Sequence, residues 1–137
     1  MAIHWNTERL NKDLARIDGA ILAGRYNLAM KLAHRSLRQY YRLCIDENGI
    51  PAEQLHPENV RHMSVIISKY LLKYYRKNEI PHSERRLMFI SLASNIIFMS
   101  HMGITESPED SPADKALATY ARENVNSIIS YLMKYFG

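Results

Sequence analysis

Five polar side chains interrupt the most apolar run of the chain, which extends from Leu87 to Ile104, and three of them, Ser94, Asn95 and His101, could form a site. Ser94 and His101 are seven residues apart, so in a helix they are separated by about two turns and point the same way. Asn95 is adjacent to Ser94. Histidine is the side chain most often used in general acid–base catalysis, and His101, Asn95 and Ser94 are therefore the candidate catalytic residues. The alternative is a set of core polar groups with satisfied hydrogen bonds, or an oligomer contact.

A row of cations earlier in the chain is the second candidate site. Lys31, Arg35, Arg38 and Arg42 are spaced four, three and four residues apart, which places them on one face of a helix. An array of this kind suits contacts with phosphates. With the cations that follow, the candidate nucleic-acid-binding residues are Lys31, Arg35, Arg38, Arg42, Lys73 and Arg76. The alternative is an ordinary solvated helix surface.

The distribution of charge favours an anionic partner. The net charge is +4. Residues 31–86 contain eleven Lys or Arg against six Asp or Glu, whereas residues 103–137 contain three against five. A basic middle region favours RNA or DNA as the partner. Tyr40, Tyr70 and Tyr75 lie among the cations and are predicted to offer rings on which bases stack.

The remaining reactive side chains give no indication of metal or nucleophilic chemistry. None of the six histidines pairs with another His or Cys at metal-ligand spacing, and the chain has neither a Gly-rich phosphate loop nor a Gly-x-Ser-x-Gly motif. Cys44 falls on an apolar stripe near a predicted helix C-terminus, where the helix dipole raises a thiol pKa. We therefore expect a buried structural cysteine, no metal site and no cofactor.

Five helices must position these residues. Apolar periodicity broken by Gly and Pro predicts helices over about 7–23, 25–47, 57–77 and 83–102. A last helix is predicted to start after Ser111 as its N-cap and to continue to about Tyr135. Short loops between long helices predict an all-α fold, an up-and-down antiparallel bundle of four to five helices. The fourth helix is apolar on most sides, so we expect it at the centre.

Composition bounds the class of protein. Apolar residues make up 47% and charged residues 23% of the chain, as in globular proteins, and 137 residues correspond to a single helical domain over residues 1–137. One cysteine cannot form an internal disulfide, and the N-terminus is too polar for a signal peptide, so we expect a cytoplasmic protein. Residues 87–104 contain too many polar groups for a comfortable membrane span, and we expect no membrane contact.

The chain resembles a HEPN domain, in the branch similar to the C-terminal domain of abortive-infection proteins. The resemblance covers most of the chain in helix order, and it is carried by Ala20–Leu37, Cys44–Ile50 and Ser94–His101. The family signature is an Arg, usually followed by a polar residue, with a His four to six residues after it. His101 matches the histidine and Asn95 the polar position, whereas Ser94 stands where the family has Arg.

This resemblance implies a helical bundle that dimerises and places both motifs in a shared cleft. Active members of the family are metal-independent ribonucleases, in which the His promotes attack by the 2′-OH and the Arg stabilises the developing charge. Loss of one such charge-stabilising group typically costs about 10²–10³ in rate, so Ser94 predicts weak or no nuclease activity. Arg85 and Arg86 lie more than two turns from Ser94 and are not expected to replace the motif Arg.

Two functions from different classes follow. The first is a HEPN-like domain of a prokaryotic defence or toxin–antitoxin type system, a homodimer that binds RNA or a partner protein. The alternative is a non-catalytic helical interaction or adaptor module with no nucleic-acid role. Binding through the cations predicts an affinity that falls steeply with salt, whereas binding through an apolar groove predicts a weak dependence.

Overall fold

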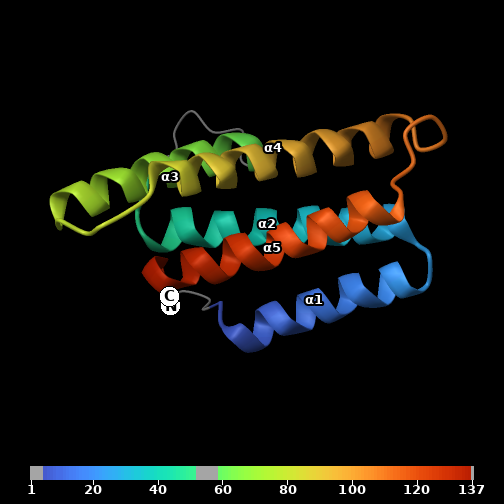
Figure 1. Ribbon diagram of the computed structural model, residues 1–137, viewed down its shortest axis with the longest axis horizontal. Coiled ribbons are helices and arrows are strands. Elements are labelled where there is room, and N and C mark those ends of the chain that lie inside the picture. Colours follow the sequence, from blue (N-terminus) through green and yellow to red (C-terminus); the bar gives the residue numbers. More distant parts are fainter. Residues whose placement is uncertain (1–4, 52–58, 137) are drawn as a thin grey trace.

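The computed structural model describes residues 5–51 and 59–136, and all regular structure within them is helical (Figure 1). The five helices are α1 (Thr7–Leu22), α2 (Tyr26–Glu47), α3 (Val60–Lys77), α4 (Glu84–Glu106) and α5 (Lys115–Phe136). They pack around one continuous apolar core to which all five contribute. The predicted all-α helical bundle is confirmed.

The centre of this bundle is α2, which packs against each of the other four helices. Figure 1 shows α3 and α4 above it, α5 beside it at about the same height, and α1 below. The expectation that the fourth helix would be central is wrong. α4 lies at the periphery, and its apolar residues on the outer face, such as Phe89 at 68% exposure and Leu92 at 54%, are covered by no described helix.

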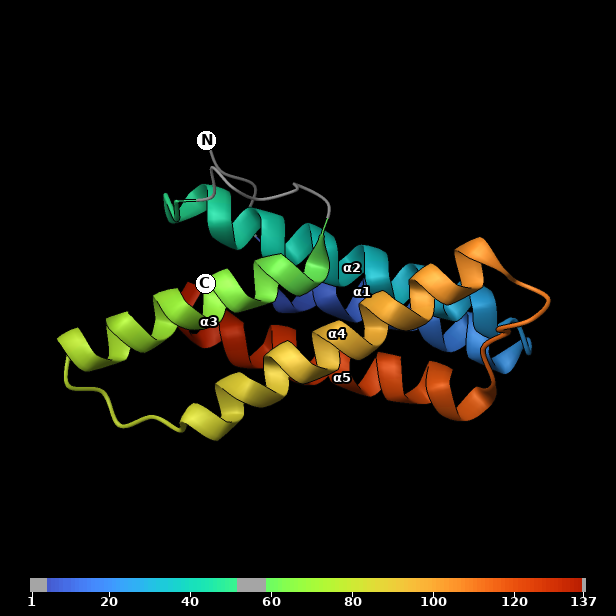
Figure 2. The same cartoon turned by 90° about the horizontal axis from the view of Figure 1, so that it is seen from above.

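The directions of the helices depart from a simple up-and-down order in one respect. Tyr41 and His34 of α2 contact Ser94 and His101 of α4, respectively, so these two helices are antiparallel. The helices α3 and α4 are antiparallel as well, since Ser68 contacts Ser91 and Arg76 contacts Glu84 near the shared end. The consecutive helices α2 and α3 therefore run in the same direction, as Figure 2 also shows.

Side-chain caps define several of the helix starts. Asn6 accepts from the Arg9 amide, and Ser83, as predicted, accepts from the Arg86 amide. Asn59 accepts from the amides of Arg61 and His62 and so starts α3. The predicted start at Pro57 lies outside the described residues. Such caps satisfy amide groups that have no partner inside the helix.

Two predicted boundaries in the last third of the chain are wrong. α4 continues to Glu106, because Gly103 does not adopt the positive φ that would end the helix. α5 starts at Lys115 rather than after Ser111. The cap is Asp114, whose carboxylate accepts from the Leu117 amide at 2.7 Å. The amide of Ala113, just before this cap, donates to Asn27 Oδ1 of α2 at 2.7 Å.

Candidate functional site

Ser94 is fully buried between α4 and α2 and opens onto no cleft. Its hydroxyl donates to the Ile90 carbonyl at 2.7 Å, one turn back. Since that bond uses its only proton, the Tyr41 hydroxyl, 2.6 Å away and also fully buried, donates to Ser94 Oγ. Ser94, which the resemblance aligns with the family's Arg, therefore joins two helices inside the core.

Asn95 and His101 lie on different sides of α4. Asn95 lines a largely apolar groove between α3 and α4, and its covered Oδ1 has no hydrogen-bond partner in the described structure. His101 is half-buried and faces α2, the same helix that Ser94 contacts. The prediction that Ser94 and His101 point the same way is confirmed. The three candidate catalytic residues, however, do not meet at a common opening.

The side chain that His101 does meet is His34 of α2. Their imidazole rings are stacked, with centroids 4.1 Å apart and planes inclined by 4°. Phe98, one turn before His101, lies 6.4 Å from the His34 ring, and the guanidinium of Arg61 lies 5.3 Å from the Phe98 ring. His34 is 6% exposed, and its Nε2 has no hydrogen-bond partner among the described residues. We refer to His34 and His101 as the histidine stack.

Both imidazoles are held in the neutral form. Burial lowers the pKa of His34 to about 4, and the nearby His101 and Arg38 lower it further in the same direction. Burial also lowers the pKa of His101, with added repulsion from Arg38 and then Lys31. Two cations of the predicted basic row therefore lie close enough to the stack to act on it electrostatically. An anion placed beside His101 would offset this repulsion.

The predicted basic row is only partly available. Lys31 and Arg35 are exposed, Arg38 is half-buried, and Arg42 is exposed and forms an ion pair with Asp46 at 3.2 Å. On α3, Lys73 is exposed and Arg76 pairs with Glu84 at 2.8 Å. Two of the six predicted cations, Arg42 and Arg76, are therefore already engaged by carboxylates.

The predicted aromatic stacking platform is wrong for two of its three members. Tyr40 is 2% exposed and Tyr75 is fully buried, so neither can stack on a base. Both rings belong to the apolar side of their helices, where Tyr40 meets Trp5 and Tyr75 meets Tyr135 edge to face. Tyr70 is half-buried and stacks on Phe136.

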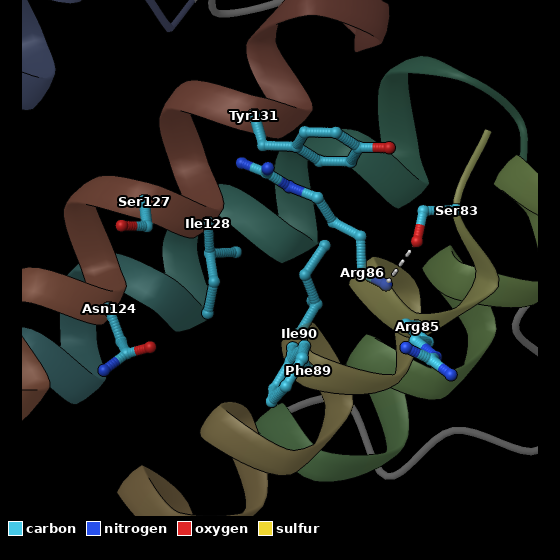
Figure 3. A pocket seen from close by; sticks show the side chains of 9 residues that line it. All are labelled: Ser83, Arg85, Arg86, Phe89, Ile90, Asn124, Ser127, Ile128 and Tyr131. Atoms are coloured by element: carbon cyan, nitrogen blue, oxygen red, sulfur yellow. Dashed lines mark hydrogen bonds between the residues drawn. The ribbon is translucent and has the colours of Figure 1, made fainter. Parts of the chain in front are cut away.

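A separate depression between α4 and α5, of about 370 Å³, is lined by Arg85 and Arg86, the two cations weighed above as substitutes for the Arg that the resemblance would require (Figure 3). The Arg86 guanidinium lies over the Tyr131 ring, 4.5 Å from its centroid, and Figure 3 shows Arg85 pointing away from that ring. Fifteen residues of helix, about 22 Å, separate Arg86 from His101. The expectation that neither arginine replaces the motif Arg is consistent with this placement.

Comparison of the chain with family models, with curated proteins and with solved structures gives no match.

Within the described residues, no group of three or more His, Cys, Asp or Glu could hold a metal ion. Cys44 is buried, as predicted, and burial raises its thiol pKa to about 12. By length and composition alone, α4 is a candidate membrane span, a test that core helices of soluble proteins also pass.

His34 is the residue that sequence reasoning missed. It follows Lys31 by three residues and precedes Arg38 by four, a spacing that places it on the same helix face as the basic row. That spacing was a usable signal. Its contact with His101 was not predictable, because it depends on the direction and register of α4 against α2.

The Tyr41–Ser94 hydrogen bond should be measurable in stability. Ser94→Ala leaves the Tyr41 hydroxyl buried without an acceptor, so we expect a loss of about 2 kcal/mol in the free energy of unfolding from urea titration. Tyr41→Phe should cost about 1 kcal/mol, and in the double variant the two costs should not add. Ser68→Ala, on a half-buried hydroxyl 3.4 Å from Ser91, is the control and should cost less than about 0.5 kcal/mol. Unchanged stability of Ser94→Ala would contradict this account.

Burial of neutral His34 should make the fold less stable in acid. Its pKa is about 4 in the folded chain and 6.5 when unfolded, so the unfolded chain binds the extra proton between these values. Stability should therefore fall by roughly 2 kcal/mol, discounted for partial solvent screening, as the pH is lowered from 6.5 to 4.

His34→Gln should remove this part of the pH dependence, measured by thermal unfolding at a series of pH values. His62→Gln, which replaces an exposed histidine on α3, is the control and should retain it. An equal acid sensitivity in wild type and His34→Gln would show that His34 is not the source.

Proposed function

We propose that this chain is a HEPN-like helical domain of a prokaryotic defence or toxin–antitoxin type system, acting in the cytoplasm and binding RNA at the histidine stack. One observation carries the proposal. Two neutral imidazoles from different helices, His34 and His101, lie stacked beside Lys31 and Arg38 at the edge of the basic face of α2. The resemblance noted above supplies the family and pathway.

The physical case rests on charge. RNA binding draws its affinity from neutralising phosphates with Lys and Arg, and Lys31, Arg35 and Arg38 share one face of α2. A phosphate near His101 would raise the pKa of that imidazole, because it offsets the repulsion from Arg38 and Lys31. Proton uptake by His101 and phosphate binding should therefore reinforce each other.

Few of the candidate catalytic residues could take part in RNA cleavage under this proposal. His101 is half-buried and can act as a general base, whereas His34 is buried and would position His101 by stacking. Ser94 is enclosed in the core and supplies nothing to a substrate. Of the two cations that lower the pKa of His101, Arg38 of α2 has the larger effect. Arg38 would therefore supply the charge that the motif Arg supplies in the family. Any cleavage would be metal-independent, as the resemblance implies.

Binding of a fluorescent single-stranded RNA, followed by anisotropy over a range of salt, tests the proposal. We expect an affinity that falls linearly on a log–log plot, and Lys31→Gln and Arg38→Gln should each reduce the slope by about one. Lys134→Gln, which replaces an exposed cation on the last turn of α5, is the control and should leave the slope unchanged. Wild-type binding by both α2 variants would refute the assignment.

The pH dependence of the same binding tests the role of His101. Because free His101 is held neutral, binding should take up a proton, and affinity should rise as the pH falls from about 7.5 to about 5.5. His101→Gln should remove the rise.

If wild type cleaves RNA and His101→Ala cleaves it equally well, His101 is not catalytic.

A different observation favours the second candidate, a non-catalytic interaction module with no nucleic-acid role. Large apolar side chains remain exposed on the outer face of α4, among them Met88, Phe89, Leu92 and Met99. An exposed apolar patch of this kind marks an interaction surface. Such binding would depend little on salt, which separates it from RNA binding at the histidine stack.

A further inference from the structure

The outer face of α4 has the spacing of a helix-pairing seam. Phe89, Leu92, Ile96, Met99 and Gly103 follow one another at intervals of three, four, three and four residues. This is the heptad spacing by which one helix packs along another. The four large residues are between 42% and 68% exposed, so the seam has no partner among the described helices. We refer to these five residues as the α4 seam.

The charges at the two ends of the seam are opposite. Arg85 and Glu106 are three heptads apart and lie on the same side of α4 as the seam. Both are exposed, and neither forms an ion pair with another described residue. Figure 3 shows that Arg85 points away from Arg86 and from the Tyr131 ring of α5. A second α4 laid antiparallel would place Arg85 against Glu106 at both ends.

From this arrangement we propose that two copies of the chain form an isologous dimer in which their α4 seams pack antiparallel. A parallel pair would place Arg85 beside Arg85 and Glu106 beside Glu106, which is unfavourable, and would also align the two helix dipoles. Charge complementarity thus selects a second copy of this chain in one orientation. The inference rests on α4 alone and holds whether or not the histidine stack binds RNA.

The register set by the end charges also fixes which side chains in between lie opposite one another. With Arg85 opposite Glu106, Met88 lies opposite Gly103, so a long side chain meets a position without one. Leu92 lies opposite Met99. The two-fold axis passes between Asn95 and Ile96, at the middle of the helix.

This dimer differs from the shared-cleft arrangement that the resemblance implies. His101 and Leu92 are nine residues apart, which places them on opposite sides of the helix. A pair formed through the α4 seam therefore leaves each histidine stack on the outside, turned toward its own α2. Under the proposed function, each protomer then presents its own anion site, and the dimer presents two.

Sedimentation velocity of the full chain from about 1 to about 100 µM tests the assembly. We expect wild type to be a dimer, and Leu92→Glu combined with Met99→Glu to be a folded monomer with unchanged helical circular dichroism. Lys73→Glu, on the exposed face of α3, is the control and should remain a dimer. A wild type that stays monomeric over this range would overturn the proposal.

A charge swap tests the orientation. Arg85→Glu and Glu106→Arg should each weaken the dimer by about tenfold, because each replaces two attractive pairs by repulsive ones. The double variant Arg85→Glu/Glu106→Arg should restore wild-type dimerisation, since it restores both pairs in reversed sense. If the double variant is weaker than either single variant, the antiparallel register is wrong.

Cysteine cross-linking tests the two-fold axis independently. The native Cys44 is buried, so an introduced cysteine should dominate oxidation. Ile96→Cys should form a disulfide-linked dimer readily, whereas Met88→Cys should not, because the two copies of residue 88 are about 22 Å apart in this register. Cross-linking of both variants would indicate a parallel pair.

Binding of the monomeric chain to phosphatidylcholine–phosphatidylglycerol vesicles, with no dimer in solution, would assign the seam to a membrane and also overturn the proposal.

Discussion

The contact between α2 and α4 is the constraint on which both proposed sites depend. Two side-chain pairs fix it, the buried Tyr41–Ser94 hydrogen bond and the stacked rings of His34 and His101. The first pair sets the depth and rotation of α4, because a buried hydroxyl without a partner is costly. With that rotation set, His101 stacks on His34 beside the basic row of α2, and the apolar seam of α4 must face outward.

The consequences for the two faces of α4 are separate. Its inner face carries polar groups that are satisfied or shielded by α2, which is why α4 can be so apolar overall and still contain Ser94 and His101. Its outer face has no such cover within the described chain. A helix that is apolar all round is normally enclosed by its own fold. In this chain a second copy would complete the enclosure, and the anion site would remain free.

Much of the fold was predictable from local signals. Apolar periodicity located five helices, and Ser83 was correctly predicted as a cap, because these features act within a few residues. The position of α4 was not, since periodicity cannot distinguish a face buried by the same chain from one left for a partner. The predicted stacking tyrosines failed for the same reason: Tyr40 and Tyr75 share helices with cations but lie on their inner faces. The sequence places His34 on the same helix face as Lys31 and Arg38. Its contact with His101 could not be predicted, because that contact depends on the register of α4 against α2.

The central claim, that RNA phosphate binds beside neutral His101, is most directly tested by the ring titration of His101. Nuclear magnetic resonance of the imidazole carbon resonances would give its pKa in the free chain and with a saturating RNA oligonucleotide, with assignment through His101→Gln. The account predicts a pKa below 6.5 in the free chain that rises on RNA binding. RNA binding that leaves the His101 pKa unchanged would contradict it.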